Sequence, residues 1–294
     1  MRVRWRAFRE CYDMRMRITS VYDKGGGLMN EDALLIGTHR FGVFDGATSL
    51  DNYIDEEGKT GGYCAANIAR EIFTAEDTPL RACAERANQA IMNAMRAKGV
   101  AVTQKEHLWN TTIAALDIGE KEFSWIQIAD SLIVVIFHDG SHKVLIDDFD
   151  HDTPVLLLWK ELAEQQTLNI REKLQEKIVA LRQKTNVDYG ALNGEEGAVR
   201  FLRSGSEPLP GVAHILLFTD GLFIPNEDPA QSGDLSLLVK LFLDGGLERV
   251  KQYVRALEMN DPNSWKYPRT KQYDDIGAIA ISFALDKPCK NRAY

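Results

Sequence analysis

The sequence has few cysteines, and they are not arranged for metal binding or cross-linking. Four cysteines occur among its 294 residues, and no two of them form a C-x-x-C pair: Cys11, Cys64, Cys83 and Cys289. This scatter excludes a zinc knuckle and a disulfide framework, so we expect reduced thiols.

Long apolar runs are also missing. No segment approaches the ~20 apolar residues of a membrane-spanning helix, and the N-terminal segment lacks the uninterrupted apolar core of a signal peptide. We therefore expect a cytoplasmic protein with no membrane partner.

Positive charge is in deficit, with a net charge of -8 and a pI near 5.4. This balance argues against general binding to nucleic acids or to acidic membranes. The N-terminus is the exception, because it concentrates six arginines: Arg2, Arg4, Arg6, Arg9, Arg15 and Arg17. We interpret this segment as a solvated strand face or a loose arm, with a polyanion-binding arm as the alternative.

The composition, with 45% hydrophobic and 27% charged residues, is that of a globular protein with one large core. We expect a single domain over residues 1–294 and a monomer. Apolar positions that alternate or form short runs predict strands at 14–22, 33–36, 41–44, 111–117, 122–129, 132–137, 143–146, 199–203, 215–218 and 276–283. Apolar positions at three- and four-residue steps predict helices at 63–75, 79–95, 234–243 and 247–257, and a helical insertion or flap at about 154–193.

The segment from Phe41 to Ala47 is an apolar strand that carries the first candidate site residue. Its apolar run ends on Asp45 and Gly46, and no Lys or Arg lies within the next thirteen residues. A carboxylate at the end of a buried strand is costly to desolvate unless a cation meets it. The same pattern recurs at Asp220, after Ile215–Phe218, and at Asp274, before the last strand. We predict that these strand ends converge on bound divalent metal.

Asp-Gly pairs also occur in ordinary turns, so a turn is the alternative interpretation of Asp45-Gly46 and Asp220-Gly221. Asp139-Gly140 separates two apolar runs as a hairpin turn does, and Asp244-Gly245 interrupts a helical pattern. Asp45 and Asp220 fit a turn less well, because no partner strand follows either of them promptly. Sequence alone leaves both interpretations open for these two aspartates.

The acids that flank apolar strands have no His or Cys beside them at ligand-like spacing: Glu31, Asp32, Asp45, Asp130, Asp220 and Asp274. Oxygen-only donors favour Mg²⁺ or Mn²⁺ over Zn²⁺. Two such ions about 3.5–4 Å apart lower the pKa of a bridging water and hold a phosphoryl group for in-line attack. The sequence has no phosphate-binding P-loop, no G-x-S-x-G elbow and no D-x-D-x-T/V motif. Phosphate-ester hydrolysis is therefore the predicted chemistry.

Five short segments, taken in order, resemble the metal-dependent type 2C Ser/Thr protein phosphatases, in particular their compact bacterial branch. They are Asn30-Glu31-Asp32-Ala33, Phe41-Gly-Val-Phe-Asp45-Gly46, Ala129-Asp130-Ser131, Leu217-Phe-Thr-Asp220-Gly221 and Asp274-Asp275-Ile276. The resemblance implies an α+β fold, a four-layer αββα sandwich of two antiparallel sheets flanked by helices. It also implies removal of phosphate from phosphoserine or phosphothreonine in proteins.

The resemblance assigns roles to individual residues. Asp45 would bridge two ions, with the Gly46 carbonyl beside it, and Asp220 and Asp274 would complete the shell of one ion. Glu31 and Asp32 would lie on the other ion, and Asp130 could hold a third. The catalytic residues would thus be Asp45, Asp220 and Asp274, with Mg²⁺ or Mn²⁺ as cofactor.

Departures from the family pattern raise a second hypothesis. Gly27 stands where many members have a phosphate-binding Arg, for which Lys24 or an N-terminal Arg is a candidate substitute. The His that protonates the leaving alcohol is absent after Gly46, Leu132 replaces another Arg, and Gly277 replaces a hydroxyl. A catalytically weak or inactive binding module is therefore the alternative to an active phosphatase.

Overall fold

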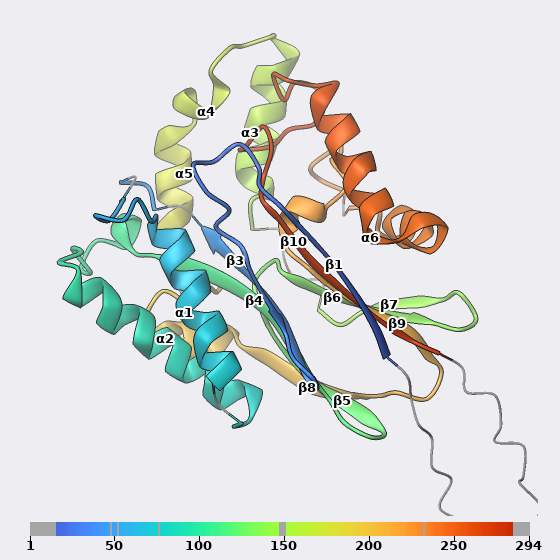
Figure 1. Ribbon diagram of the computed structural model, residues 1–294. Coiled ribbons are helices and arrows are strands. Elements are labelled where there is room, and N and C mark those ends of the chain that lie inside the picture. Colours follow the sequence, from blue (N-terminus) through green and yellow to red (C-terminus); the bar gives the residue numbers. More distant parts are fainter. Residues whose placement is uncertain are drawn as a thin grey trace, which may run out of the picture.

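The computed structural model describes residues 16–47, 49–51, 53–75, 77–146, 151–231 and 233–284. Apart from Arg17, the basic N-terminal segment lies outside these ranges, so its predicted role stays a prediction. The strands in the described ranges form two five-stranded antiparallel sheets. Figure 1 shows how the sheets and helices are arranged.

The first sheet has the order β2-β3-β4-β5-β8. Its strands are β2 (Ala33–Ile36), β3 (Arg40–Ala47), β4 (Asn110–Ile118), β5 (Glu122–Ile128) and β8 (Arg203–Pro208). The strands predicted at 33–36 and 41–44 form a hairpin, since Ala33 pairs with Phe44. The predicted strand at 199–203 is wrong, because Glu196–Phe201 is a short 3₁₀ helix and β8 begins only at Arg203. The apolar residues that suggested a strand there pack under α2 instead.

The second sheet has the order β1-β10-β9-β6-β7. Its strands are β1 (Met16–Asp23), β10 (Ile276–Phe283), β9 (Val212–Phe218), β6 (Leu132–Phe137) and β7 (His142–Val144). The turn predicted at Asp139-Gly140 joins β6 to β7, and Gly140 has a φ of 85° that favours glycine.

Three apolar layers hold the sandwich together. The middle layer lies between the sheets, where Phe41 and Val43 of β3 meet Ile133 of β6 and Ile279 of β10. These side chains come from alternate strand positions, which point to the same face of a sheet.

Helices cover the two outer faces (Figure 1). Helices α1 (Gly61–Ala75) and α2 (Leu80–Ala97) bury an apolar layer on the first sheet. Helix α6 (Leu235–Met259) buries another on the second sheet. The break predicted within α6 is confirmed by its non-helical glycines, Gly245 and Gly246. The predicted four-layer αββα sandwich is confirmed.

The segment expected to be a helical insertion is helical, and it lies at one end of the sandwich (Figure 1). It consists of α3 (Thr153–Glu164), α4 (Ile170–Lys173) and α5 (Gln175–Arg182). Val155, Trp159 and Ile170 give it a small core of its own. No helix within the described ranges is long and apolar enough to cross a membrane.

Arg40 is buried at the start of β3 and holds the sheet to the helical layer. Its guanidinium donates to both carboxylate oxygens of Asp117, at 2.6 and 2.7 Å, and to the carbonyls of Phe73 and Thr78. Breaking a buried ion pair leaves a desolvated charge behind, at a cost of roughly 3–5 kcal/mol.

We expect Arg40→Met to lower the free energy of unfolding by about this amount, because Asp117 would lose its partner. The double variant Arg40→Met/Asp117→Leu should recover part of the loss, since no charge then remains. Urea denaturation of the wild type, both single variants and the double variant measures the coupling. Equal stabilities of the Arg40→Met and wild-type proteins would contradict this role.

Candidate active site

Four aspartates from separate parts of the chain meet at the end of the sandwich that carries the insertion. Asp45 lies in β3, which continues two residues past it rather than ending there, and Asp220 follows β9. Asp274 precedes β10, and Asp130 lies in the turn between β5 and β6. The residue before Asp130, Ala129, has a φ of 60°, an uncommon backbone conformation for a residue with a Cβ. We call these four aspartates the acidic floor.

The acidic floor is electrostatically strained. Burial raises the pKa of Asp45 well above its ordinary value, and the charges of Asp220, Asp32 and Asp274 raise it further. Burial also raises the pKa of Asp220, again with Asp274 and Asp130 adding to the shift. These directions are those expected for carboxylates that share a desolvated site.

Asp45 and Asp220 line the same cavity. The charge of Asp220 raises the pKa of Asp45, whereas Asp45 partly offsets the rise in the pKa of Asp220. Two carboxylates in one desolvated site are stabilised by a proton or a cation between them. The structure thus brings these two residues and Asp274 to one cavity, and their binding of metal stays a prediction.

A lysine that the sequence did not single out faces the floor. Lys271 donates from Nζ to Oδ1 of Asp274 at 2.6 Å, and its side chain is 35% exposed. Although burial lowers it, the pKa of Lys271 lies well above its ordinary value because Asp274, Asp45 and Asp220 face it. The expectation that metal alone could neutralise these acids was thus incomplete.

Asp130 has an oxygen without a partner. Its Oδ1 is buried and has no hydrogen bond from the described residues, whereas its Oδ2 lies 3.7 Å from Nε2 of His151. The His151 ring stacks on Tyr189 with centroids 4.2 Å apart. Sequence reasoning missed both aromatic residues, which no motif marks.

Glu31 and Asp32 lie behind the floor. The Glu31 carboxylate accepts a hydrogen bond from the Thr60 hydroxyl, and Asp32 Oδ2 accepts one from Thr219 Oγ1 at 2.8 Å. The backbone N–H of Glu31 donates to Asp275 at 2.8 Å. Asp275 therefore joins the Glu31 loop to the strand that follows Asp274.

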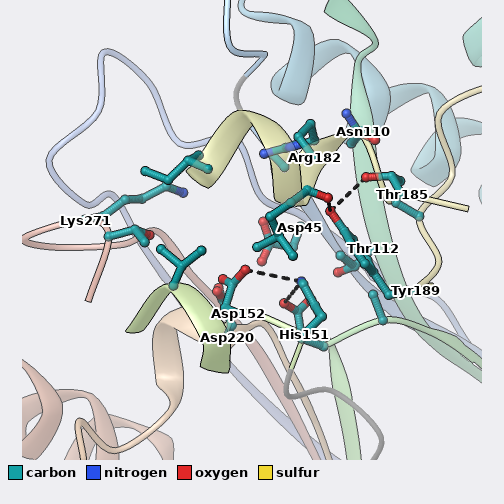
Figure 2. A pocket seen from close by; sticks show the side chains of 18 of the residues that line it. Asp45, Asn110, Thr112, His151, Asp152, Arg182, Thr185, Tyr189, Asp220 and Lys271 are labelled. Atoms are coloured by element: carbon teal, nitrogen blue, oxygen red, sulfur yellow. Dashed lines mark hydrogen bonds and ion pairs between the residues drawn. The ribbon is translucent and has the colours of Figure 1, made fainter. Parts of the chain in front are cut away.

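The floor opens into a cavity of about 140 Å³, shown in Figure 2. Figure 2 labels His151, Tyr189, Lys271 and Arg182 on its other sides. Arg171 also lines the cavity. Arg182 belongs to α5, so the insertion supplies part of the wall. Lys24 is exposed and is not among the lining residues, because its Nζ donates to the carbonyl of Gly27 at 2.8 Å.

Gly46 permits a close backbone approach beside Asp45. A Cβ at this position would lie 2.3 Å from the carbonyl oxygen of Gly62 and 2.6 Å from that of Glu31. No other residue fits here without moving the start of α1. The Asp45-Gly46 pair is thus a packing requirement within β3 and not a hairpin turn.

The donor set suits hard divalent cations. It consists of carboxylate oxygens, among them those of Asp45 and Asp220, whose pKa values burial raises, and it includes the unpaired Oδ1 of Asp130. Within the described ranges, no three His, Cys, Asp or Glu side chains already surround one point as the ligands of an ion do. Carboxylates repel one another, so drawing them into a complete shell requires the charge of the cation itself.

The fold and the acidic floor together define a metal-dependent hydrolase of the αββα class. Residues 24–257 match the family model for protein phosphatase 2C, and the chain belongs to this family. It is therefore a metal-dependent protein Ser/Thr phosphatase, and the family uses Mg²⁺ or Mn²⁺. A search of curated proteins found no match.

Several solved bacterial phosphatases share the fold. The catalytic domain of PstP, in complex with two manganese ions, is 16% identical, with a TM-score of 0.58 over 92% of this chain and 100% of that one. PppA from Pseudomonas aeruginosa is 17% identical, with a TM-score of 0.58 over 92% and 98% of the two chains. Stp1 from Staphylococcus aureus is 15% identical, with a TM-score of 0.56 over 93% and 96%.

The raised pKa of Asp45 predicts how the stability of the metal-free protein depends on pH. A carboxyl group whose pKa is higher in the folded state stabilises the fold most below its unfolded pKa, near 3.8 here. That contribution is lost as the pH rises through the folded-state pKa. We expect the melting temperature in chelator to fall as the pH rises above about 4 and passes through the raised folded-state pKa.

Asp45→Asn removes this ionisation, so it should stabilise the metal-free protein at neutral pH, by about 1–2 kcal/mol, and flatten the pH profile. Thermal unfolding in chelator across this pH range measures both effects. Asp188→Asn, at an exposed position, serves as the control. A variant that is less stable than the wild type at neutral pH would contradict the proposed strain.

Proposed function

We propose that this chain hydrolyses phosphoserine and phosphothreonine in proteins with two divalent ions held by its acidic floor and a third, weaker ion at Asp130. The observation that supports this is the convergence of Asp45, Asp220 and Asp274. These residues come from three distant segments and form one desolvated cluster under a cavity. When bound, the ions supply an activated water and hold the phosphoryl oxygens.

The position of each floor residue decides which ion we assign it to. Asp45 lies centrally, because its pKa responds to Asp220, Asp32 and Asp274 together, and we assign it to both ions, with the Gly46 carbonyl beside it. Asp220 and Asp274 are assigned to one ion.

Glu31 and Asp32 are assigned to the second ion, from behind the floor. The Thr60 and Thr219 hydroxyls hold their carboxylates in place, since each donates a hydrogen bond to one of them. Fixed ligands lose less conformational entropy when an ion binds.

The helical insertion is assigned as the flap that selects the protein substrate, because Arg171 and Arg182 place it on the cavity wall. We further propose a monomer that acts in the cytoplasm in signalling on phosphorylated proteins. Its net charge of -8 supports a role without nucleic acid or membrane partners.

An inactive binding module is the competing function. Its motivation is the absence of the family's phosphate-binding Arg and of its acidic His. The buried floor argues against it, because a binding module would gain nothing from carboxylates that repel one another in a desolvated site.

We expect Asp45→Asn and Asp274→Asn each to lower kcat for p-nitrophenyl phosphate by roughly 100-fold or more, because each removes charge that stabilises the transition state through the ions. Chelator should abolish wild-type activity, and Mn²⁺ or Mg²⁺ should restore it. Asp139→Asn, in an exposed turn, should leave activity unchanged. Hydrolysis that survives chelator and both floor substitutions would eliminate the proposed function.

Arg182→Gln tests the flap. Arg182 lies on the cavity wall rather than on the floor, so it should contact the substrate protein. We expect KM for a phosphopeptide to rise about tenfold, the loss of roughly 1.4 kcal/mol of binding, while KM for p-nitrophenyl phosphate stays within about twofold. Lys177→Gln, exposed on the same helix, is the matched control. Equal effects on both substrates would argue against a selecting flap.

A further inference from the structure

A phosphate monoester that enters the cavity is doubly negative, and a cation supplied by the protein would help the bound ions to hold it beside the acidic floor. Among the residues that the structure describes, Lys271, Arg171 and Arg182 are the lysine and arginines that line the cavity. Arg171 is exposed and donates to the Thr270 carbonyl at 2.7 Å, and Arg182 belongs to the insertion. Of these described cations, Lys271 contacts a floor carboxylate, with its Nζ 2.6 Å from Oδ1 of Asp274.

The loop that carries Lys271 is held in place before any substrate arrives. Asp261 accepts hydrogen bonds from the backbone N–H groups of Trp265 and Tyr267, at 2.9 Å each. Arg269 donates to the same carboxylate at 2.8 Å, and Arg255 donates to the Asp274 carbonyl at 2.6 Å. A fixed loop presents the ammonium group with little loss of entropy on binding.

Lys271 also lies where two cavities meet. A second cavity of about 510 Å³ extends from the floor between the insertion and the start of α6, and Lys271, Asp220 and Asp274 line both. A phosphate group at Lys271 would therefore leave room on either side for the rest of a peptide.

We propose that Lys271 binds the phosphate group of the substrate, a role that rests on the proposed function. Its Nζ donates to a phosphoryl oxygen that the floor and its ions do not hold. Gly27 offers no side chain for this task, and Lys24 donates to backbone carbonyls at the surface. The Lys271–Asp274 ion pair keeps the ammonium group at the floor until the phosphate arrives.

A purely structural role makes different predictions. If Lys271 only neutralises Asp274, its removal changes the affinity for metal or the stability but leaves phosphate binding intact. If Lys271 binds phosphate, its removal weakens the binding of the substrate and of inorganic phosphate alike. Inorganic phosphate is therefore the informative probe, because its binding needs no turnover.

The experiment compares full-length Lys271→Met and Lys271→Arg with the wild type at saturating Mn²⁺. Lys266→Met is the matched control, because Lys266 lies in the same loop, is exposed and pairs with Glu227. The measurements are KM and kcat for p-nitrophenyl phosphate, the Mn²⁺ concentration for half-maximal activity, and inorganic phosphate binding by calorimetry. Circular dichroism verifies folding, and Lys271→Arg keeps the charge should Lys271→Met be unstable.

We expect Lys271→Met to raise both KM and the Kd for inorganic phosphate at least tenfold. Lys271→Arg should recover most of this loss, and Lys266→Met should stay within twofold of the wild type. An unchanged phosphate Kd in Lys271→Met, with an altered Mn²⁺ requirement, would overturn the proposal. So would a tenfold effect in Lys24→Met that is absent in Lys271→Met. Phosphate binding that depends on Lys271 in a protein without turnover would instead refute only the proposed function.

Discussion

Repulsion among desolvated carboxylates is the constraint on which the site depends. Asp45, Asp220 and Asp274 repel one another when they are ionised, and burial raises the pKa of the first two. The apolar layers on both faces of each sheet provide the free energy that holds them together. The cluster therefore costs stability in the metal-free protein and becomes favourable when divalent cations neutralise it.

The sandwich places these charges through its backbone, not through their side-chain contacts. Antiparallel pairing brings the C-terminal end of β9 and the N-terminal end of β10 to one edge of the second sheet. Two glycines next to the site allow neighbouring backbone segments to approach closely. Gly46 admits the carbonyl of Gly62, and a Cβ on Gly221 would lie 1.8 Å from the Asp275 carbonyl. Substituting either glycine would shift the aspartate beside it.

Local patterning next to apolar runs was sufficient for most of the strands and for the helical layers, but not for the 3₁₀ helix at Glu196–Phe201. The same patterning marked Asp45, Asp220 and Asp274, which line one cavity. It missed Lys271, although this residue lies only three positions before Asp274, because a loop lysine beside an acid resembles any surface ion pair. It missed His151 and Arg182 because their places depend on how the insertion folds over the site. The signal for Lys24 was proximity in sequence to Gly27, and chain proximity does not determine where a side chain points.

Two tryptophans link the insertion to the loop that carries Lys271. Trp159 of α3 donates from Nε1 to the Ser264 carbonyl at 2.9 Å, and Trp265 donates from Nε1 to the Thr167 carbonyl at the same distance. These two hydrogen bonds thus join the insertion, which would select the substrate, to the loop of Lys271, which would bind its phosphate. A shift of the insertion cannot leave Lys271 unaffected, because the loop between Ser264 and Asp274 is short and anchored at both ends. If the insertion selects the substrate and Lys271 binds its phosphate, the two recognition steps would be coupled through these contacts.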